Sequence, residues 1–332
     1  MKRSTLKDIA KLTGLSVSGV SRALKDHPDI APETKERVKE VAKALNYHPN
    51  PNAQFLHSKS SKIIAVILPE VNTFFFPEIL QGISKVVEQH GYFLIFLQSD
   101  NKFQKEKDLI DYCIQMFVDG VLISISAETT SLDHLLKLKE MDAAVVLIDR
   151  VLSNDSIPFL TIDDVEASRK AVEHLISKGH TNIFGIFDDG RLSMTNLRAS
   201  GFRQALEQNG LHCGENRILI VNGDVEIEEQ IIQLIDENSE LAAIFTMSDK
   251  LMVKAYHAIN SLGFKIPDDI ALISISDGKA PYYLYPGISH IRHSGEEVGT
   301  SAATLLFRML SDEKNLEGFH QIETKLVELG SV

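Results

Sequence analysis

The chain divides at the stretch NYHPNPNAQFLHS, which runs from Asn46 to Ser58. A basic, helix-like sequence precedes this stretch, and a long acidic sequence of alternating strands and helices follows it. Within the stretch, Asn50 can cap a helix whose first position is Pro51, where the missing N–H costs nothing. A helix this short is not stable alone in water. We therefore predict a conditional helix in a hinge at residues 49–61; the alternative is a plain linker between two domains.

The length and composition are those of an ordinary globular protein. The 332 residues suffice for two or three domains, and 44% of them are hydrophobic, which is enough for a sizeable core. No apolar run approaches the roughly 18–20 residues of a transmembrane helix, and the first residues do not form an apolar leader. Cys113 and Cys213 predict buried thiols in a reducing compartment. We expect a cytoplasmic protein with no membrane partner.

The net charge of −12 is unevenly distributed. Residues 1–60 carry 11 Lys and Arg against 6 Asp and Glu, a balance of +5. Residues 61–332 carry 23 against 40, a balance of −17. A basic head on an acidic body indicates that the head meets a polyanion and the body does not.

Three short helices are predicted in the head. Apolar residues recur at helical spacing in 6–13, 17–24 and about 33–45. Gly14 ends the first helix, and Ser16 caps the second. Two short helices joined by a glycine-containing turn, with a third helix behind them, predict a DNA-binding helix-turn-helix. The alternative is a generic three-helix bundle with a solvated basic face.

The second predicted helix carries side chains suited to reading DNA. It begins with small polar residues that can approach base edges, and Arg22 can donate two hydrogen bonds to guanine O6 and N7. Hydroxyl groups around it can donate to phosphates. The residues predicted to contact DNA in the head are Thr5, Leu6, Ser16, Val17, Ser18, Ser21, Arg22, Thr34 and Tyr47.

The body is predicted to be α/β, with two doubly wound parallel-sheet halves beside the small all-α head. Apolar runs of strand length alternate with helix-like segments, which is typical of right-handed βαβ units. The strands are predicted at 63–68, 93–97, 121–123 and 144–148 in the first half, and at 183–187, 218–221, 243–246 and 271–275 in the second. Such an architecture places a cleft at the carboxyl ends of both sheets.

No catalytic constellation is apparent in the body. The sequence has no Gly-x-Gly-x-x-Gly after a strand, no phosphate-binding loop and no His-Glu-x-x-His. His290 and His293 have no evident carboxylate or cysteine partner for a metal. The pair Asp163-Asp164 fits a helix cap better than an acid/base pair. We predict no enzyme activity, no cofactor and no metal site.

Aromatic and charged residues at strand ends favour a binding cleft instead. The run Phe74–Phe76 precedes Pro77, and three successive rings cannot all face the core, so at least one can form a flat wall for a sugar ring or a base. Asp149 and Arg150 follow one strand and Asp277 follows another. Such groups accept from and donate to paired hydroxyls in a fixed geometry.

Three motifs of the head resemble the LacI/GalR family of bacterial transcription regulators. They are TLKDIA from Thr5, LSVSGVSRAL from Leu15 and LNYHPN from Leu45, and the resemblance extends over essentially the whole chain. It implies a repressor that binds a pseudo-palindromic, double-stranded operator as a homodimer. It also implies a periplasmic-binding-protein-like body, in whose cleft a small-molecule effector, a sugar or sugar derivative, controls operator affinity allosterically.

The resemblance implies roles for single residues as well. In the family, the leucine matched by Leu56 is a wedge inserted into the minor groove, and Asn50 and Ala53 lie in the same DNA-contacting hinge. The matched effector positions are Phe75, Phe76, Asp149, Arg150, Asn196, Ser248, Asp277 and His293. Arg198 matches a family arginine, and two roles stay open for it, one structural and one in ligand contact.

Three positions depart from common family choices. Gly19 replaces a threonine, which removes a phosphate contact and weakens the helix by up to about 1 kcal/mol. Asn196 stands where many sugar-responsive relatives have arginine, and Ser248 where asparagine is frequent. Both are poorer donors, so the resemblance does not transfer the identity of the ligand.

These patterns predict the domain boundaries. The helix-turn-helix domain spans 1–48, the hinge 49–61 and the effector-binding and dimerisation domain 62–332. Family resemblance implies three crossings between the halves, near Phe159–Asp164, Pro286–His293 and Ile322–Leu329. The N-subdomain then comprises about 62–160 and 290–322, and the C-subdomain about 163–287 and 323–332.

Two other classes of protein fit part of the sequence. A solute-binding protein would share the body, but the basic head and the absent leader argue against it. An α/β enzyme with a nucleic-acid-binding appendage would share the charge asymmetry, but it would need a catalytic constellation.

Overall fold

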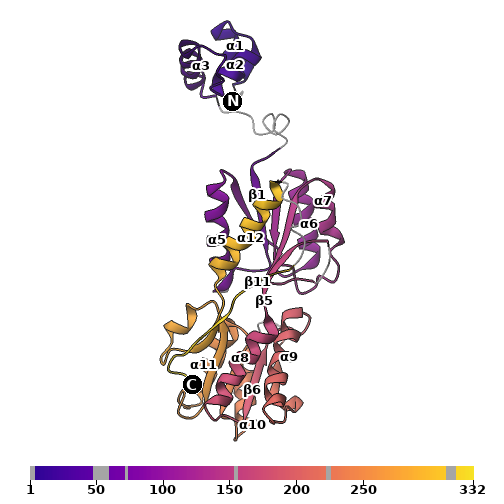
Figure 1. Ribbon diagram of the computed structural model, residues 1–332, viewed down its shortest axis with the longest axis vertical. Coiled ribbons are helices and arrows are strands. Elements are labelled where there is room, and N and C mark those ends of the chain that lie inside the picture. Colours follow the sequence, from indigo (N-terminus) through magenta and orange to yellow (C-terminus); the bar gives the residue numbers. More distant parts are fainter. Residues whose placement is uncertain (1–3, 48–59, 72–73, 153–155, 222–225, 312–318) are drawn as a thin grey trace. The chain divides into compact units, whose positions relative to one another are not determined.

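The computed structural model describes residues 4–47, 60–71, 74–152, 156–221, 226–311 and 319–332. The chain forms two compact units, Met1–Ser61 and Lys62–Val332, which we call the head and the body (Figure 1). The predicted hinge helix, with Asn50, Ala53 and Leu56, lies outside the described residues. None of the helices in the described ranges is both long and apolar enough to cross a membrane.

Three helices form the described part of the head, residues 4–47, as predicted. α1, α2 and α3 span Leu6–Thr13, Val17–Leu24 and Pro32–Ala44. α3 begins slightly earlier than predicted because proline is well suited to the first helical position. The residues that build the small core between the helices are Ile9, Ala10, Val20, Ala23, Val38 and Ala42.

Local caps fix the turn between α1 and α2. The Thr5 N–H and hydroxyl donate to the Asp8 carboxylate at 2.8 and 2.7 Å, at the start of α1. Gly14 ends α1 with a φ of 71°, a conformation that glycine adopts without strain. Ser16 Oγ accepts from the Gly19 N–H at 3.1 Å, which confirms Ser16 as the N-cap of α2. The direction of α2 is therefore set by the residues next to it in sequence.

The first half of the body, which we call the N-subdomain, is built on a six-stranded sheet. Its strands are β1 (Ile63–Leu68), β2 (Phe93–Gln98), β3 (Gly120–Ile123), β4 (Ala144–Ile148), β5 (Phe159–Ile162) and β11 (Phe319–Ile322), and they lie in the order β11-β5-β4-β3-β1-β2. All the neighbouring pairs are parallel. α5 (Phe75–Gln89) and α12 (Gly295–Leu310) cover one face, and α6 (Phe103–Gln115) and α7 (Asp133–Glu140) cover the other (Figure 1).

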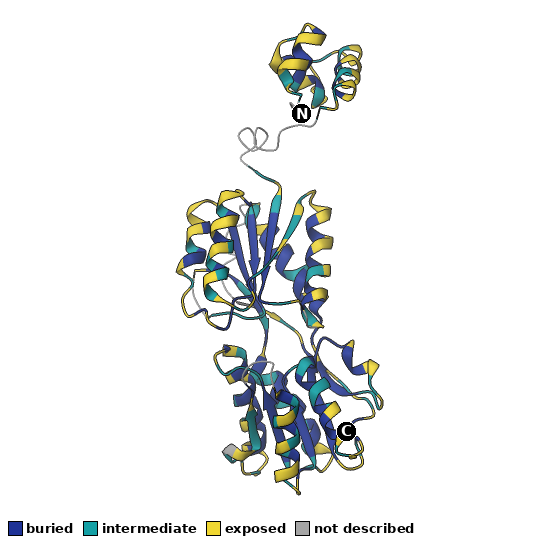
Figure 2. Cartoon of the chain, turned by 180° about the vertical axis from the view of Figure 1, so that it is seen from behind, coloured by how far each residue is buried: buried dark blue, intermediate teal, exposed yellow. Residues whose placement is uncertain are grey.

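The second half, the C-subdomain, repeats this architecture. Its strands are β6 (Ile183–Phe187), β7 (Ile218–Ile220), β8 (Ala243–Thr246), β9 (Ala271–Ser276), β10 (Ser289–Arg292) and β12 (Lys325–Val327), in the order β12-β10-β9-β8-β6-β7. Only β12, of these strands, runs antiparallel to its neighbour. The helices are α8 (Asp164–Ser177), α9 (Ser193–Gln208), α10 (Ile227–Glu237) and α11 (Asp249–Ser261), with short 3-10 helices η1 (Glu215–Arg217) and η2 (Ala280–Tyr283). The buried strands lie at the centre of each half, as Figure 2 shows.

The crossings between the halves fall close to the predicted segments, with one shift. The chain passes from β5 to α8 after Ile162, and it returns between β10 and α12. We predicted that residues from about 290 belong to the N-subdomain, but β10 pairs with β9 and continues to Arg292. Because this strand completes the second sheet, the return comes a few residues later. The last crossing separates β11 from β12, after Ile322.

α5 and α12 pack with their backbones in direct approach. A Cβ on Gly299 would lie 2.1 Å from the carbonyl oxygen of Ile79, and a Cβ on Gly82 would lie 2.3 Å from that of Glu296. Both distances are far inside van der Waals contact with backbone that cannot rotate away. The glycines are therefore required for these two helices to share one face of the sheet.

We expect Gly299→Ala to lower the free energy of unfolding of the body by at least the roughly 1–3 kcal/mol typical of overpacking. Thr304→Ala on the exposed face of the same helix is the matched control, and its effect is within about 0.5 kcal/mol. Urea titration followed by circular dichroism measures both. Equal stabilities for the two variants would show that α5 and α12 are not held at this distance in solution.

Candidate functional site

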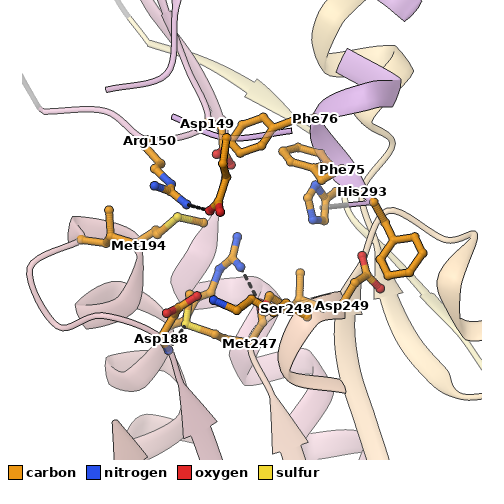
Figure 3. A pocket seen from close by; sticks show the side chains of 16 residues that line it. Phe75, Phe76, Asp149, Arg150, Asp188, Met194, Met247, Ser248, Asp249 and His293 are labelled. Carbon is orange, nitrogen blue, oxygen red and sulfur yellow. Dashed lines mark hydrogen bonds and ion pairs between the residues drawn. The ribbon is translucent and has the colours of Figure 1, made fainter. Parts of the chain in front are cut away.

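The carboxyl ends of both sheets meet at a cavity of about 90 Å³ within the body. We call this cavity the aromatic chamber (Figure 3). Its walls come from segments that follow strands and from the first turns of helices, which is where ligands bind in doubly wound folds. The lining residues are Glu70, Phe74, Phe75, Phe76, Asp149, Arg150, Asp188, Leu192, Met194, Arg198, Met247, Ser248, Asp249, Lys250, Ile275 and His293.

The first turn of α5 provides the apolar wall. The Phe75 ring lies edge-on to the imidazole of His293, with 4.6 Å between the ring centroids. Phe76 is buried, and the guanidinium carbon of Arg150 lies 5.8 Å from its ring centroid. Phe74 remains 45% exposed at the rim. The three successive rings thus do not all face the core, as predicted, and the wall that they form offers a flat apolar face.

Arg150 is held rigidly by neighbours from two other loops. Its guanidinium donates to Asn101 Oδ1 at 3.1 Å and to Glu70 Oε1 at 3.2 Å. The adjacent Asp149 has a φ of 59°. Burial raises the pKa of Asp149 to about 6, and the charges of Arg150 and Arg198 oppose that rise. At neutral pH the cavity therefore presents a carboxylate and a guanidinium side by side, both set before any ligand arrives.

Arg198 lines the cavity and also holds the C-subdomain together. Its Nε donates to Asp164 Oδ1 at 2.7 Å, and its Nη1 donates to the carbonyl oxygen of Met247. Both charged side chains are only 4% exposed. The two roles that the sequence left open are thus compatible, because a structural ion pair places this guanidinium in the wall.

Ser248 and Asp249 begin α11 at the floor of the chamber. Ser248 Oγ accepts from the Leu251 N–H as the helix cap, so its hydroxyl is already engaged with the backbone. Asp249 Oδ2 accepts from the Asp277 N–H at 3.1 Å, while its Oδ1 is buried and has no hydrogen-bond partner among the described residues. Burial, followed by the nearby Asp277 carboxylate, raises the pKa of Asp249 to about 7.

His293 is a neutral imidazole in this wall. Burial, together with the charge of Arg198, lowers its pKa to about 3. Its Nδ1 is buried without a hydrogen-bond partner in the described part of the chain. His293 and Asp249 therefore each turn an unpaired polar atom into or beside the cavity, and a buried atom of this kind is costly unless a ligand or water satisfies it.

Seven of the nine predicted effector positions line the chamber. They are Phe75, Phe76, Asp149, Arg150, Arg198, Ser248 and His293. Asn196 is exposed, and its amide donates to the carbonyl oxygens of Gly190 and Leu192 at 3.0 and 3.4 Å. Asp277 is buried behind Asp249, and its Oδ1 accepts from the Lys279 N–H at 2.8 Å. Neither of these two side chains belongs to the lining.

Sequence reasoning missed several charged and sulfur-containing residues of the wall. They are Glu70, Asp188, Met194, Met247, Asp249 and Lys250. All of them lie within a few residues of the end of β1, β6 or β8, or in the first turns of α9 and α11. The general rule that ligands bind at the carboxyl ends of parallel strands would have found them.

In the head, five of the nine predicted DNA-contacting residues lie on α2 or at its N-cap. Ser16, Val17, Ser18 and Arg22 are exposed, whereas Val20 and Ala23 face the core. A Cβ on Gly19 would lie 3.3 Å from Ser16 Oγ, so a larger residue there would press on the cap of α2. Of the remaining predicted contacts, Ser21 lies on α2 itself and is half-buried. Thr5 is exposed, and Leu6, Thr34 and Tyr47, which lie outside α2, are half-buried.

Comparison with known proteins extends over both units. The family model of periplasmic binding proteins and the sugar binding domain of the LacI family matches residues 61–308. The family model of bacterial regulatory proteins of the lacI family matches residues 5–50. The two matches correspond to the body and to the head.

Individual relatives agree with these matches. Catabolite control protein A of Priestia megaterium is 29% identical over 315 residues, which is 93% of each chain. The ribose operon repressor of Halalkalibacterium halodurans is 27% identical, covering 98% of this chain and 96% of that protein. The crystal structure of the lac repressor dimer bound to operator and the anti-inducer ONPF has the same fold, with a TM-score of 0.85 at 20% identity over 99% of each chain. With a helix-turn-helix head and a two-sheet body that each match their family model, this chain belongs to the LacI family of bacterial transcription regulators.

Proposed function

We propose that this protein is a dimeric repressor whose operator affinity is set by a sugar or sugar derivative bound in the aromatic chamber. The observation that carries the proposal is the chamber itself. It joins an aromatic wall to a rigid Asp149–Arg150 pair, and its lining comes from both subdomains of one chain that also carries a helix-turn-helix. Flat apolar faces and paired donors and acceptors are what a sugar ring needs.

The DNA side of the proposal rests on α2. Ser16 at its N-cap and Val17, Ser18 and Arg22 on the helix are exposed, whereas Val20 and Ala23 are buried in the core of the head. The helix can therefore enter a major groove without losing its packing. One such head contacts only a few base pairs. A two-fold dimer that reads a pseudo-palindrome provides the length that genomic specificity requires.

The effector side rests on contacts that span the two subdomains. Ser193 Oγ donates to the carbonyl oxygen of Val151 at 2.9 Å, and Lys279 forms an ion pair with Glu78. These contacts must break or shift if the cleft opens. A ligand that touches both walls shifts the balance between open and closed bodies by its difference in affinity for them.

We propose that the change between open and closed bodies acts on the hinge. Residues 49–61 are separated from β1, whose first residue is Ile63, by Lys62 alone. Ordering about eight residues costs something like 8–16 kcal/mol of backbone entropy, so a hinge helix needs DNA and its dimer mate to form. Leu56 is the proposed minor-groove wedge, supported by Asn50 and Ala53, because inserted apolar side chains unstack and kink a duplex.

Gel-shift assays with fragments of the host genome test the regulator. We expect salt-sensitive retention of a few fragments, changed by one member of a panel of sugars, sugar phosphates, uronates and nucleobases. Thermal shift against the same panel identifies the ligand independently of DNA. Equal retention of all fragments would contradict the proposal that the protein binds DNA sequence-specifically. If a nucleobase were the only compound that changed retention, the effector would be a nucleobase and not a sugar.

Arg150→Met tests the chamber. Methionine keeps the apolar stem but removes the donors of the guanidinium, and hydrogen bonds to charged groups contribute about 1.5–3 kcal/mol each. We expect roughly tenfold to hundredfold weaker effector binding by calorimetry. Arg203→Met, an exposed arginine of α9, is the matched control and keeps wild-type affinity. Unchanged effector affinity in Arg150→Met would place the ligand elsewhere.

A further inference from the structure

A second, larger cavity adjoins the aromatic chamber in the body. It has a volume of about 320 Å³, and we call it the polar chamber. It extends from Arg150 toward the edge of the N-subdomain sheet, where Gln98 ends β2 and Asp100 and Asn101 follow. From the C-subdomain, the loop between β6 and α9 closes it with Asp189 and Arg191.

The two chambers lie directly beside each other. Their linings share five residues, Glu70, Arg150, Asp188, Leu192 and Lys250. The Arg150 guanidinium stands at the junction, with Phe76 on the aromatic side and with Asn101 and Glu70 on the polar side. In Figure 3, Arg150 lies across the aromatic chamber from Phe75 and His293. A ligand seated on the aromatic wall can therefore continue past Arg150.

The two volumes favour a ligand that extends beyond the aromatic chamber. Small-molecule sites in proteins have volumes of about 300–1,000 Å³. The aromatic chamber, at about 90 Å³, is well below this range, whereas the polar chamber, at about 320 Å³, lies within it. A ligand confined to the aromatic chamber would leave the larger space, with its hydrogen-bonding groups, to solvent.

The charges of the polar chamber select against an anionic ligand. Its described lining has four carboxylates, from Glu70, Asp100, Asp188 and Asp189, and three cations, from Arg150, Arg191 and Lys250. Both arginines are engaged: Arg150 with Glu70 at 3.2 Å, and Arg191 Nε with both oxygens of Asp189 at 3.0 Å. A phosphate or uronate would have to displace these carboxylates and lie near the others. Hydroxyl groups, which donate as well as accept, suit carboxylates and amides in such a wall.

We propose that the polar chamber is a second sugar subsite and that the effector is a neutral glycoside of at least two rings. One ring lies on the wall of Phe75 and Phe76, and the next lies beyond Arg150 among Gln98, Asp188 and Asp189. This inference rests on the proposed function, because it assumes that a sugar occupies the aromatic chamber.

Calorimetry on the full-length protein tests the ligand class. The probes are glucose, galactose, ribose, maltose, cellobiose, lactose and glucose 6-phosphate. We expect one of the disaccharides to bind at least roughly tenfold more tightly than its component monosaccharide, which corresponds to one or two net hydrogen bonds to the second ring. Glucose 6-phosphate binds more weakly than glucose. A monosaccharide that binds as tightly as every disaccharide, or a sugar phosphate that binds best, would overturn the inference and leave the sugar effector in place.

Gln98→Trp tests the location of the second ring. The Gln98 amide donates to Asp100 Oδ1 at 2.6 Å in the wall of the polar chamber, and an indole at this position fills the space. We expect the ratio of disaccharide to monosaccharide affinity to fall to about one. In Gln233→Trp, a glutamine of α10 whose amide donates to Glu237 far from either lining, the ratio keeps its wild-type value.

The outcomes separate this inference from the proposed function. A wild-type ratio in Gln98→Trp would place the second ring outside the polar chamber. Binding of none of the seven probes would remove the sugar effector itself, and the inference with it, while operator retention in gel shifts would still establish the regulator.

Discussion

Arg198→Ala is expected to lower the free energy of unfolding of the body by about 3–5 kcal/mol, the cost of leaving a buried charge without its partner. Asp164 and Arg198 are each only 4% exposed, and 2.7 Å separates the Asp164 Oδ1 and Arg198 Nε atoms. The alanine also leaves the Met247 carbonyl oxygen without the donor that joins α9 to the end of β8. This ion pair therefore connects α8, α9 and β8 at the floor of the aromatic chamber.

The pH dependence of this loss of stability shows whether it comes from the removed charge or from the cavity that the smaller side chain leaves. Burial raises the pKa of Asp164, and the charge of Arg198 lowers it. In Arg198→Ala the lowering by Arg198 is gone and the raising of the Asp164 pKa by burial remains. Asp164 therefore binds a proton more tightly in the folded variant than in the unfolded chain. Stability contributed by that proton is present at acid pH and is lost as the pH rises through the raised pKa. The difference between wild type and variant should therefore be larger at pH 8 than at pH 5.

Two further variants complete this experiment. Arg169→Ala removes a partly exposed arginine that pairs with Glu166 and Glu173 on α8, and we expect a loss of no more than about 1 kcal/mol. The double variant Asp164→Asn/Arg198→Met removes both charges and should recover part of the stability lost in Arg198→Ala. Urea titrations at both pH values measure all four proteins. A loss in Arg198→Ala that equals the loss in Arg169→Ala, or that does not change with pH, would contradict the buried pair.

The elements of the body could be predicted because each strand is an apolar run. β1, β4 and β6 are buried almost throughout, and such strands show as continuous aliphatic sequence bounded by turns. β11 and β12 were not predicted as strands. They are four and three residues long, and it is the pairing of β11 with β5 and of β12 with β10 that selects their conformation. Pairing of this kind depends on residues far away in sequence.

The cleft was predicted less completely than the fold because its wall depends on which strand ends meet. For α9, however, helical periodicity alone predicts which residues can face the chamber. Met194 and Arg198 are four residues apart and line the same chamber, as residues at this spacing share a helix face. Asn196 is about 200° around the helix from Met194 and points elsewhere. The resemblance supplied both Asn196 and Arg198, but one helix face cannot carry both.

Arg22→Ala is expected to cause the largest loss of function. An arginine that donates two hydrogen bonds to guanine contributes about 1–3 kcal/mol of discrimination. In a two-fold dimer both heads lose this contact, so we expect about 2–6 kcal/mol, or roughly 30-fold to 10⁴-fold weaker operator binding. Arg22 is exposed in the last turn of α2, while Val20 and Ala23 carry the packing, so the head should keep its fold.

The measurement compares two duplexes, the fragment selected in gel shifts and the same fragment with scrambled sequence, by fluorescence anisotropy at several salt concentrations. Lys43→Ala, an exposed residue in the last turn of α3, is the control for a lost positive charge. It should weaken both duplexes alike and only slightly, because a phosphate contact carries no sequence information. An equal loss on both duplexes in Arg22→Ala would show that Arg22 contacts phosphate rather than a base.

The proposed two-fold dimer allows a further test of the same variant. A hybrid dimer in which only one of the two heads carries Arg22→Ala should lose half of the binding free energy that the doubly substituted dimer loses, because the two half-sites are read independently by separate heads. The effect of the second substitution then equals that of the first on a logarithmic scale. If the first substitution instead abolished nearly all the specificity, the heads would be coupled. Joint ordering of residues 49–61 from both chains, which the proposed hinge helix requires, would provide such coupling. The hybrid therefore tests, in one titration, whether the two heads read their half-sites independently or are coupled.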